Sequence, residues 1–195
     1  LAAKGFFDAS ELDNLRQVGA ILQGHPDMKK IPGVDMSTGS LGQGISAAVG
    51  MALGAKIDAA DWKTYVLLGD GELQEGLVWE AAMSAAHYKL DNLIAFVDNN
   101  NLQIDGAITD VMSPYPIDEK FAAFGWNVIN IADGNDFDQL REGLEKAYAC
   151  EGKPSVLVCK TVKGKGVSYM ENNAGWHGKG PNAEQVEIAL KELED

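Results

Sequence analysis

An acidic turn bounded by glycines follows a run of strand-forming residues near the middle of the chain. The run YVLL leads into Gly69-Asp70-Gly71, and the next charged residues are Glu72 and Glu75, with no Lys or Arg among them. A glycine-rich phosphate loop ordinarily carries a basic residue, whereas Asp70 would repel a bare phosphate. Taken alone, the tripeptide is also a common turn, because Gly tolerates positive φ and Asp hydrogen-bonds its own backbone. Its chemistry therefore depends on what lies beside it.

A second polar strand end follows the first. Residues 92–98, NLIAFVD, lead into Asn99-Asn100-Asn101, and the chain between the two turns is long enough for one helix and one returning strand. Neighbouring parallel strands end at the same edge of a sheet, where ligands bind, so we expect Asp70 to lie beside the asparagines. Carboxylate, amide and carbonyl oxygens suit Mg²⁺ or Ca²⁺. The two turns together predict a cation that in turn holds a phosphate group.

Strand-like and helical patterns alternate along the chain, and this alternation predicts the fold. Helices are expected at residues 9–24, 42–57, 76–90, 117–125, 137–150 and 183–195, and strands at 64–69, 92–98, 126–132 and 154–162. The first helix opens with Ser10 and Asp13 at a capping spacing and ends at Gly24. We expect an α/β fold, a mainly parallel β-sheet covered by helices on both faces, with residues 1–195 forming a single domain. The long irregular stretch 163–183 is typical of a functional loop.

Composition limits the classes of function. The chain of 195 residues has 16 Lys plus Arg against 29 Asp plus Glu, a net charge of -13, which argues against a nucleic-acid or anionic-membrane partner. No apolar run reaches the roughly 20 residues that span a bilayer, and the start LAAKGFFDASELDNL lacks the layout of a signal peptide. The cysteines, Cys150 and Cys159, match no metal-ligand spacing. We expect a reducing, cytoplasmic setting.

The spacing of Gly69-Asp70-Gly71 and Asn99-Asn100 resembles the diphosphate fingerprint of thiamine diphosphate enzymes. Further stretches, among them GHPD, STGSLGQG, KTVKGKGVS and WHGKGP, resemble the diphosphate-binding half of transketolase over nearly all of the chain. The motif GHPD followed by STGSLGQG, together with the late WHG, favours transketolase over the related dehydrogenase and deoxyxylulose-phosphate synthase branches. The resemblance implies the thiamine diphosphate-binding fold and its diphosphate domain.

The resemblance also implies a cofactor site. Asp70 and Asn100 would ligate Mg²⁺ through side-chain oxygens and Leu102 through its backbone carbonyl, and Ca²⁺ or Mn²⁺ could substitute. Gly39 and Leu41 would lie against the thiazolium side of thiamine diphosphate, because glycine lets the backbone approach a ring closely. The full set of cofactor-binding residues implied in this way is Gly39, Leu41, Gly69, Asp70, Gly71, Asn100, Leu102, Ile104 and His177.

Three residues are the candidate catalytic groups. His25, between Gly24 and Pro26, belongs to a turn that cannot continue a helix, so it is either a solvated loop histidine or, as the resemblance implies, a proton-handling substrate contact. His177, in the long loop, would contact the diphosphate and the substrate. Glu75 is either part of a solvated acidic face or, by the resemblance, a member of a carboxylate network at a subunit interface.

The resemblance implies transfer of a two-carbon ketol unit from a ketose phosphate to an aldose phosphate. In the family a glutamate of a pyrimidine-binding domain activates the cofactor, and neither that domain nor the small C-terminal domain is present in these 195 residues. The family's domain also begins with a further segment, bearing two histidine turns, that we expect to be lacking here. We therefore expect the N-terminal subunit of a split transketolase, inactive alone, that pairs with a pyrimidine-domain subunit in an assembly such as a heterotetramer.

That expectation includes self-association when the partner is absent. The face around residues 75–88, EGLVWEAAMSAAHY, should be unusually apolar, because a second subunit would cover it. Two alternatives stay open. One is a non-catalytic or incomplete subunit that keeps the fold as a scaffold, and the other is a Mg²⁺-dependent phosphohydrolase, although no Walker motif occurs.

Overall fold

The computed structural model describes residues 1–194, so Asp195, at the end of the last expected helix, lies outside the described residues. The helices are α1 Gln43–Ile57, α2 Gly76–His87, α3 Ile108–Met112, α4 Ile117–Ala123, α5 Phe137–Tyr148 and α6 Ala183–Leu193. The strands are β1 Thr64–Gly69, β2 Leu93–Asn99, β3 Leu102–Gln103, β4 Gly106–Ala107, β5 Asn127–Ile131 and β6 Ser155–Lys160. Short 3₁₀ turns occur at Ala2–Lys4, Ala9–Asn14, Gly71–Gln74 and Ala174–Trp176.

The sheet is parallel, as the alternating pattern predicts. Four strands lie in the order β1-β2-β6-β5, and every pair in this sheet is parallel, while β3 and β4 form a small antiparallel hairpin. The register pairs Gly69 of β1 with Asp98 of β2, and Asn99 of β2 with Lys160 of β6. The carboxyl ends of the strands therefore meet at one edge, and this edge carries the candidate site.

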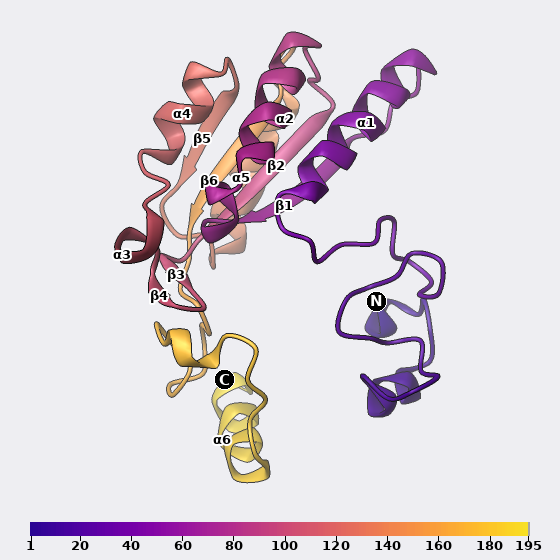
Figure 1. Cartoon of the computed structure of the whole chain (residues 1–195), viewed down its shortest axis with the longest axis vertical. Coiled ribbons are helices and arrows are strands. Elements are labelled where there is room, and N and C mark those ends of the chain that lie inside the picture. Colours follow the sequence, from indigo (N-terminus) through magenta and orange to yellow (C-terminus); the bar gives the residue numbers. More distant parts are fainter. Residues whose placement is uncertain (195) are drawn as a thin grey trace.

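Helices cover both faces of the sheet, which confirms the expected fold class. Helices α1, α2 and α4 pack on one face, and their core includes Ile45, Val78 and Phe121, all completely or almost completely buried (Figure 1). On the opposite face α5 packs over β5 and β6, where Leu157 is buried. This second layer stops short of β1, so Leu67 remains 70% exposed.

The helix expected at residues 9–24 is wrong. Only Ala9–Asn14 forms a 3₁₀ turn, in which the Asp8 carboxylate caps the backbone N–H of Ser10, and Arg16 then takes a left-handed φ of 64°. None of the residues in the 3₁₀ turn is buried. Because helices are stabilised mainly by tertiary packing, a capping pattern without a core to pack on leaves this segment as turns.

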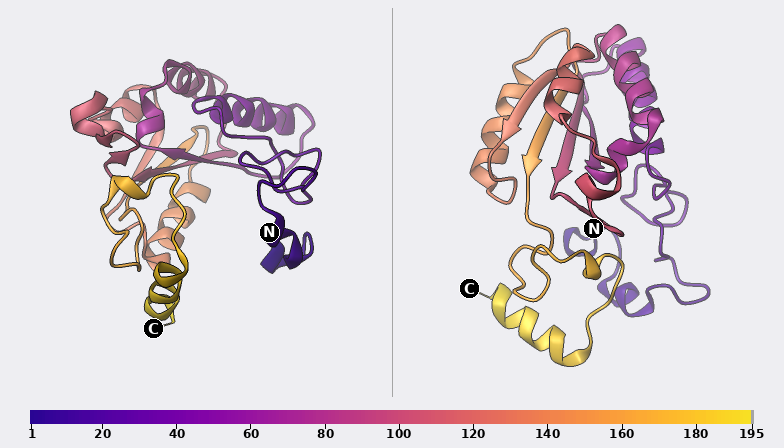
Figure 2. Two further views of the ribbon diagram at one scale, coloured as in Figure 1. Left: turned by 60° about the horizontal axis from the view of Figure 1, so that its bottom comes forward. Right: turned by 60° about the vertical axis from the view of Figure 1, so that its left-hand side comes forward.

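The two ends of the chain lie on the side toward which the strands point. Figure 2 shows the arrowheads of the sheet directed at the side that holds both the segment before α1 and the segment that leads to α6. The second segment is irregular up to α6, as expected, and it is attached to that helix through the Tyr169 hydroxyl, which donates to the Gln185 carbonyl at 2.7 Å. Among residues 1–194, no helix is long and apolar enough to cross a membrane.

Candidate functional site

Asp70 stands directly after β1 and is buried, with 1% of its surface exposed. Its Oδ1 accepts the backbone N–H of Gly71 at 2.8 Å, and its Oδ2 accepts the N–H of Asn101 at 2.5 Å. The carboxylate thus joins the turn after β1 to the turn after β2, as the strand spacing predicts. Burial raises the pKa of Asp70, while these two N–H groups act in the opposite direction.

Asn100 is held in the second turn by both ends of its amide. Its Oδ1 accepts the N–H of Leu102 at 3.0 Å, and its Nδ2 donates to Asp98 Oδ2 at 3.1 Å. The Thr161 hydroxyl donates to the other oxygen of Asp98. Since Asp98 fixes the nitrogen end, the amide oxygen of Asn100 keeps a defined direction and retains a second lone pair.

Tyr115 supports the same turn, although the sequence did not predict it as part of the site. Its hydroxyl is bonded to the side-chain oxygens of Asn99, at 2.8 Å, and of Asn101, which has a left-handed φ of 66°. Burial raises the pKa of Tyr115, and the nearby charge of Asp70 adds to the increase. Nothing in the local sequence marks this tyrosine, because the contact forms only when the chain folds.

The donor set fits a hard divalent cation. Asp70 is a buried carboxylate to which no basic side chain of residues 1–194 is bonded, and burial without a counter-charge opposes its ionisation. Among residues 1–194, no three His, Cys, Asp or Glu side chains gather into a metal cage. A cation here would therefore combine one carboxylate with the amide oxygen of Asn100 and the carbonyl of Leu102, and water or phosphate oxygens would complete its shell.

His25 and Gly39 are brought into direct contact. Gly39 has a φ of +130°, and a Cβ built on it would lie 2.0 Å from Cδ2 of His25. The imidazole therefore rests on the glycine backbone, at the point where the loop turns toward α1. Leu41, two residues further along, is 60% exposed.

The remaining residues predicted for the site are exposed. Glu75 is exposed, and its Cβ lies 2.8 Å from where a Cβ on Gly42 would be. Ile104 is 69% exposed beyond β3, and His177 is exposed after the last 3₁₀ turn. Within the described residues His177 makes no side-chain hydrogen bond or ion pair, so the structure does not join it to His25 or Asp70.

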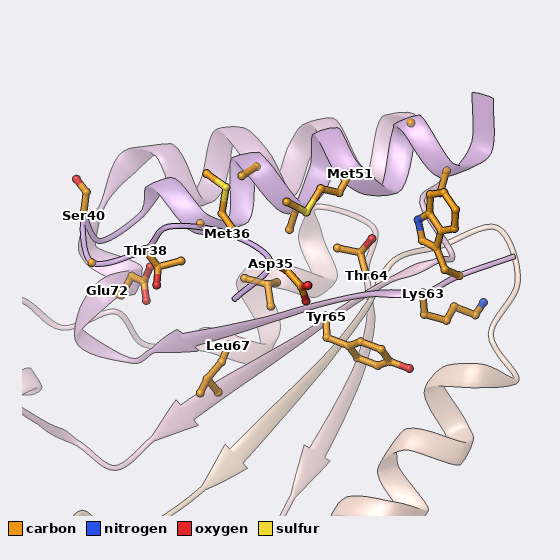
Figure 3. A pocket seen from close by; sticks show the side chains of 18 of the residues that line it. Asp35, Met36, Thr38, Ser40, Met51, Lys63, Thr64, Tyr65, Leu67 and Glu72 are labelled. Atoms are coloured by element: carbon orange, nitrogen blue, oxygen red, sulfur yellow. The ribbon is translucent and has the colours of Figure 1, made fainter. Parts of the chain in front are cut away.

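A groove beneath α1 overlaps the candidate site only at one end. The groove, of about 980 Å³, runs along β1 and is lined at that end by Gly39, Leu41 and Glu72 (Figure 3). The rest of the groove follows the outer edge of β1, which pairs with no strand other than β2 among residues 1–194. The groove reflects this open edge, whereas the polar chemistry is concentrated at the strand ends.

The exposed face of α2 is less apolar than expected. Val78, Ala81, Ala82 and Ala85 point into the core, and Met83, 60% exposed, is the one large exposed hydrophobic residue within the helix. Tyr88, the C-cap of α2, is also 50% exposed, but Glu75, Glu80 and His87 are exposed as well, so the expected apolar character of residues 75–88 is wrong for most of this face. The same pattern of small residues instead serves to pack α2 closely on α1 and the sheet.

Comparison with known proteins identifies the family. Residues 3–193 match the family model for the transketolase, thiamine diphosphate binding domain. The chain is 46% identical over its whole length to an apulose-4-phosphate transketolase subunit of Phocaeicola vulgatus, covering 69% of that protein. It is 45% identical to a 6-deoxy-6-sulfo-D-fructose transketolase subunit of a Clostridium species, covering 70% of that protein. The crystal structure of Campylobacter jejuni transketolase superimposes with a TM-score of 0.88 at 35% identity, over 95% of this chain and 30% of the other. The chain therefore belongs to the transketolase family and carries its thiamine diphosphate-binding domain.

Proposed function

We propose that this chain is the N-terminal subunit of a split transketolase that binds thiamine diphosphate through Mg²⁺. Asp70 and Asn100 supply side-chain oxygens to the cation and Leu102 supplies its carbonyl oxygen. The observation that carries the proposal is the buried carboxylate of Asp70, which accepts N–H groups from both strand-end turns and has no basic partner in the described part of the chain. A diphosphate beside it requires a cation between the two negative groups.

When bound, the cofactor supplies the carbanion stabilisation that ketol transfer requires. The chain's own residues would anchor its diphosphate and exchange protons with substrate hydroxyls. His25 is suited to this role because it is accessible and its ring is set against Gly39. His177 would join it from the loop before α6, and Glu75 would lie at a subunit interface. We also place the protein in the cytoplasm, where sugar phosphates are available.

The partner would supply the rest of the active site. Two relatives are named as subunits of transketolases rather than as whole enzymes, which supports a second chain bearing the pyrimidine-binding domain. Their names contain apulose 4-phosphate and 6-deoxy-6-sulfo-D-fructose, which supports a ketose of this kind as the donor. In the proposal the acceptor is an aldose phosphate. In the proposal, the partner supplies the activating glutamate and the residues that bind the sugar phosphate.

Calorimetry with two ligands tests the proposed Mg²⁺ and diphosphate site. Inorganic pyrophosphate and thiamine diphosphate should each bind the wild-type chain in Mg²⁺ and lose binding in excess chelator. Asp70→Ala should abolish this Mg²⁺-dependent binding, whereas Asp138→Ala, which removes an exposed carboxylate on α5, should leave it unchanged. Undiminished binding of either probe by Asp70→Ala would show that the site assignment is wrong.

Reconstitution tests the split active site. The chain alone, with thiamine diphosphate, Mg²⁺, a ketose phosphate donor and ribose 5-phosphate, should give no ketol transfer until the pyrimidine-domain subunit is added. Loss of an activating group of this kind typically costs orders of magnitude in rate. Robust turnover by the chain alone would overturn the split-subunit proposal, and binding without turnover in every combination would favour the scaffold alternative.

A further inference from the structure

Glu72 connects two segments of the candidate site that are far apart in sequence. Its Oε1 accepts the backbone N–H of Gly42 at 2.8 Å, and its Oε2 accepts the N–H of Gly69 at 3.1 Å. Gly69 directly precedes Asp70, and Gly42 is the N-cap of α1. One half-buried carboxylate thus holds the cation turn and the start of α1 at the same time.

This bridge is the polar link between the N-terminal segment and the sheet. Among the described residues, the bond from Gly42 to Glu72 is the one hydrogen bond that joins residues 1–42 to residues 58–194, and no ion pair joins them. Figure 1 shows the segment before α1 extending away from the sheet and its covering helices. The position of that segment relative to Asp70 therefore depends strongly on this carboxylate.

The surroundings of Gly42 make the bridge specific. A Cβ on Gly42 would lie 2.8 Å from the Cβ of Glu75, so the glycine is held between the Glu72 carboxylate and the Glu75 side chain. Helix α1 has no acidic residue in its first turn and no side-chain cap. Glu72 places a negative charge near this N-terminus, where the helix dipole favours it. Thr38 and Glu72 both line the groove beneath α1 (Figure 3).

We propose that Glu72 is a positioning residue that sets the Gly39–Gly42 loop, and with it His25, at a fixed distance from the Asp70 turn. This proposal deepens the proposed function, and the part of it that concerns cofactor binding rests on that function. The cation and the diphosphate need only the strand-end turns. In the proposed site the thiazolium side of thiamine diphosphate would also meet the Gly39 loop, so its binding would depend on the bridge as well.

The test compares two ligands in Glu72→Gln. The glutamine amide keeps the shape of the side chain but can accept only one of the two N–H groups, and its own N–H₂ faces the other. Mg²⁺-dependent binding of inorganic pyrophosphate should remain within about twofold of wild type, because Asp70 keeps its own bonds to the N–H groups of Gly71 and Asn101 when the bond from Gly69 to Glu72 is weakened. The affinity for thiamine diphosphate should fall at least about tenfold, as expected for loss of a charge-assisted hydrogen bond. Glu145→Gln, an exposed change on α5, is the matched control and should alter neither affinity.

Amide hydrogen exchange gives a second readout that needs no ligand. In Glu72→Gln, the peptide that covers residues 38–45 should exchange at least about tenfold faster, while the β2 peptide keeps its wild-type protection. Unchanged exchange at residues 38–45 would overturn the positioning role, and so would an equal loss of pyrophosphate and thiamine diphosphate affinity. Failure of the wild-type chain to bind either ligand would instead overturn the proposed function, and the exchange result would still decide the role of Glu72.

Discussion

Adding one methyl group at Gly39 should displace His25 without unfolding the protein. The new Cβ would lie 2.0 Å from Cδ2, 2.8 Å from Cγ and 2.9 Å from Nε2 of the imidazole. Ordinary contact between carbon atoms begins near 3.5 Å, so the ring must move by about 1.5 Å. The φ of +130° is itself unfavourable for alanine, at a cost of about 1–3 kcal/mol. Both residues are exposed, so we expect the loop to shift and the core to stay intact.

Displacements of this size can be costly for catalysis. A misplacement of about 1 Å can lower a rate about 10²-fold, and we expect this loss of turnover in Gly39→Ala once the enzyme is reconstituted. NMR of the three histidine rings gives a partner-free assay, because the resonances of His25 should move and those of His87 and His177 should not.

The matched control is Gly50→Ala, on the surface of α1. A Cβ at Gly50 would meet no atom within 4 Å, and alanine is the better helix former, so the change should stabilise the chain slightly and leave the His25 signals in place. If Gly39→Ala kept both the wild-type His25 resonances and wild-type turnover, the contact between His25 and Gly39 would not be a functional one.

Three further predictions concern the histidines, the core and one ion pair. His25→Ala and His177→Ala should each lower turnover about 10²-fold, while the free energy of unfolding changes by only about 0.5 kcal/mol. Wild-type turnover in both variants would show that the two residues are solvated loop histidines without a catalytic role. Phe121→Ala, which empties a fully buried site, should lower the free energy of unfolding in urea by about 3–5 kcal/mol, and a loss below about 1 kcal/mol would contradict the described packing. Burial alone would raise the pKa of Asp91, but the bonds from Lys56, at 2.8 Å, and from a backbone N–H lower it. The stability that Asp91 contributes should therefore be complete above its unfolded pKa of about 3.9 and disappear as the pH falls through the lower folded pKa. Asp91→Asn should lower the free energy of unfolding by up to about 1 kcal/mol at neutral pH and by nothing in strong acid. A cost that is independent of pH would refute this prediction.

The sheet and its order of elements could be predicted because their signals are local. Each strand of the main sheet is a short apolar run that ends in a turn, and α1 and α2 show the small-residue pattern of closely packed helices. The approach of Asp70 to the second turn followed from the same information. Parallel pairing of β1 with β2 brings those ends together, and the backbone N–H of Asn101 bonds the carboxylate.

Other features depend on contacts that no local pattern reveals. The segment after Asp8 carries a capping signal, yet it has no face to bury, and the chain turns at Arg16. Tyr115 reaches its asparagine partners across the hairpin that follows β2, and Glu72 reaches Gly42 across α1 and β1. The acidic turn was visible in the sequence, but only the fold distinguishes the bridging Glu72 from the exposed Glu75.

A crystal structure of the chain grown with Mg²⁺ and thiamine diphosphate would test the central claim most directly. We expect one cation at the edge formed by the turns after β1 and β2, bound by Asp70, the Oδ1 of Asn100 and the carbonyl oxygen of Leu102 at about 2.0–2.1 Å, with diphosphate oxygens completing its shell. A diphosphate bound elsewhere, or a cation at this edge that contacts none of these three oxygens, would contradict the account.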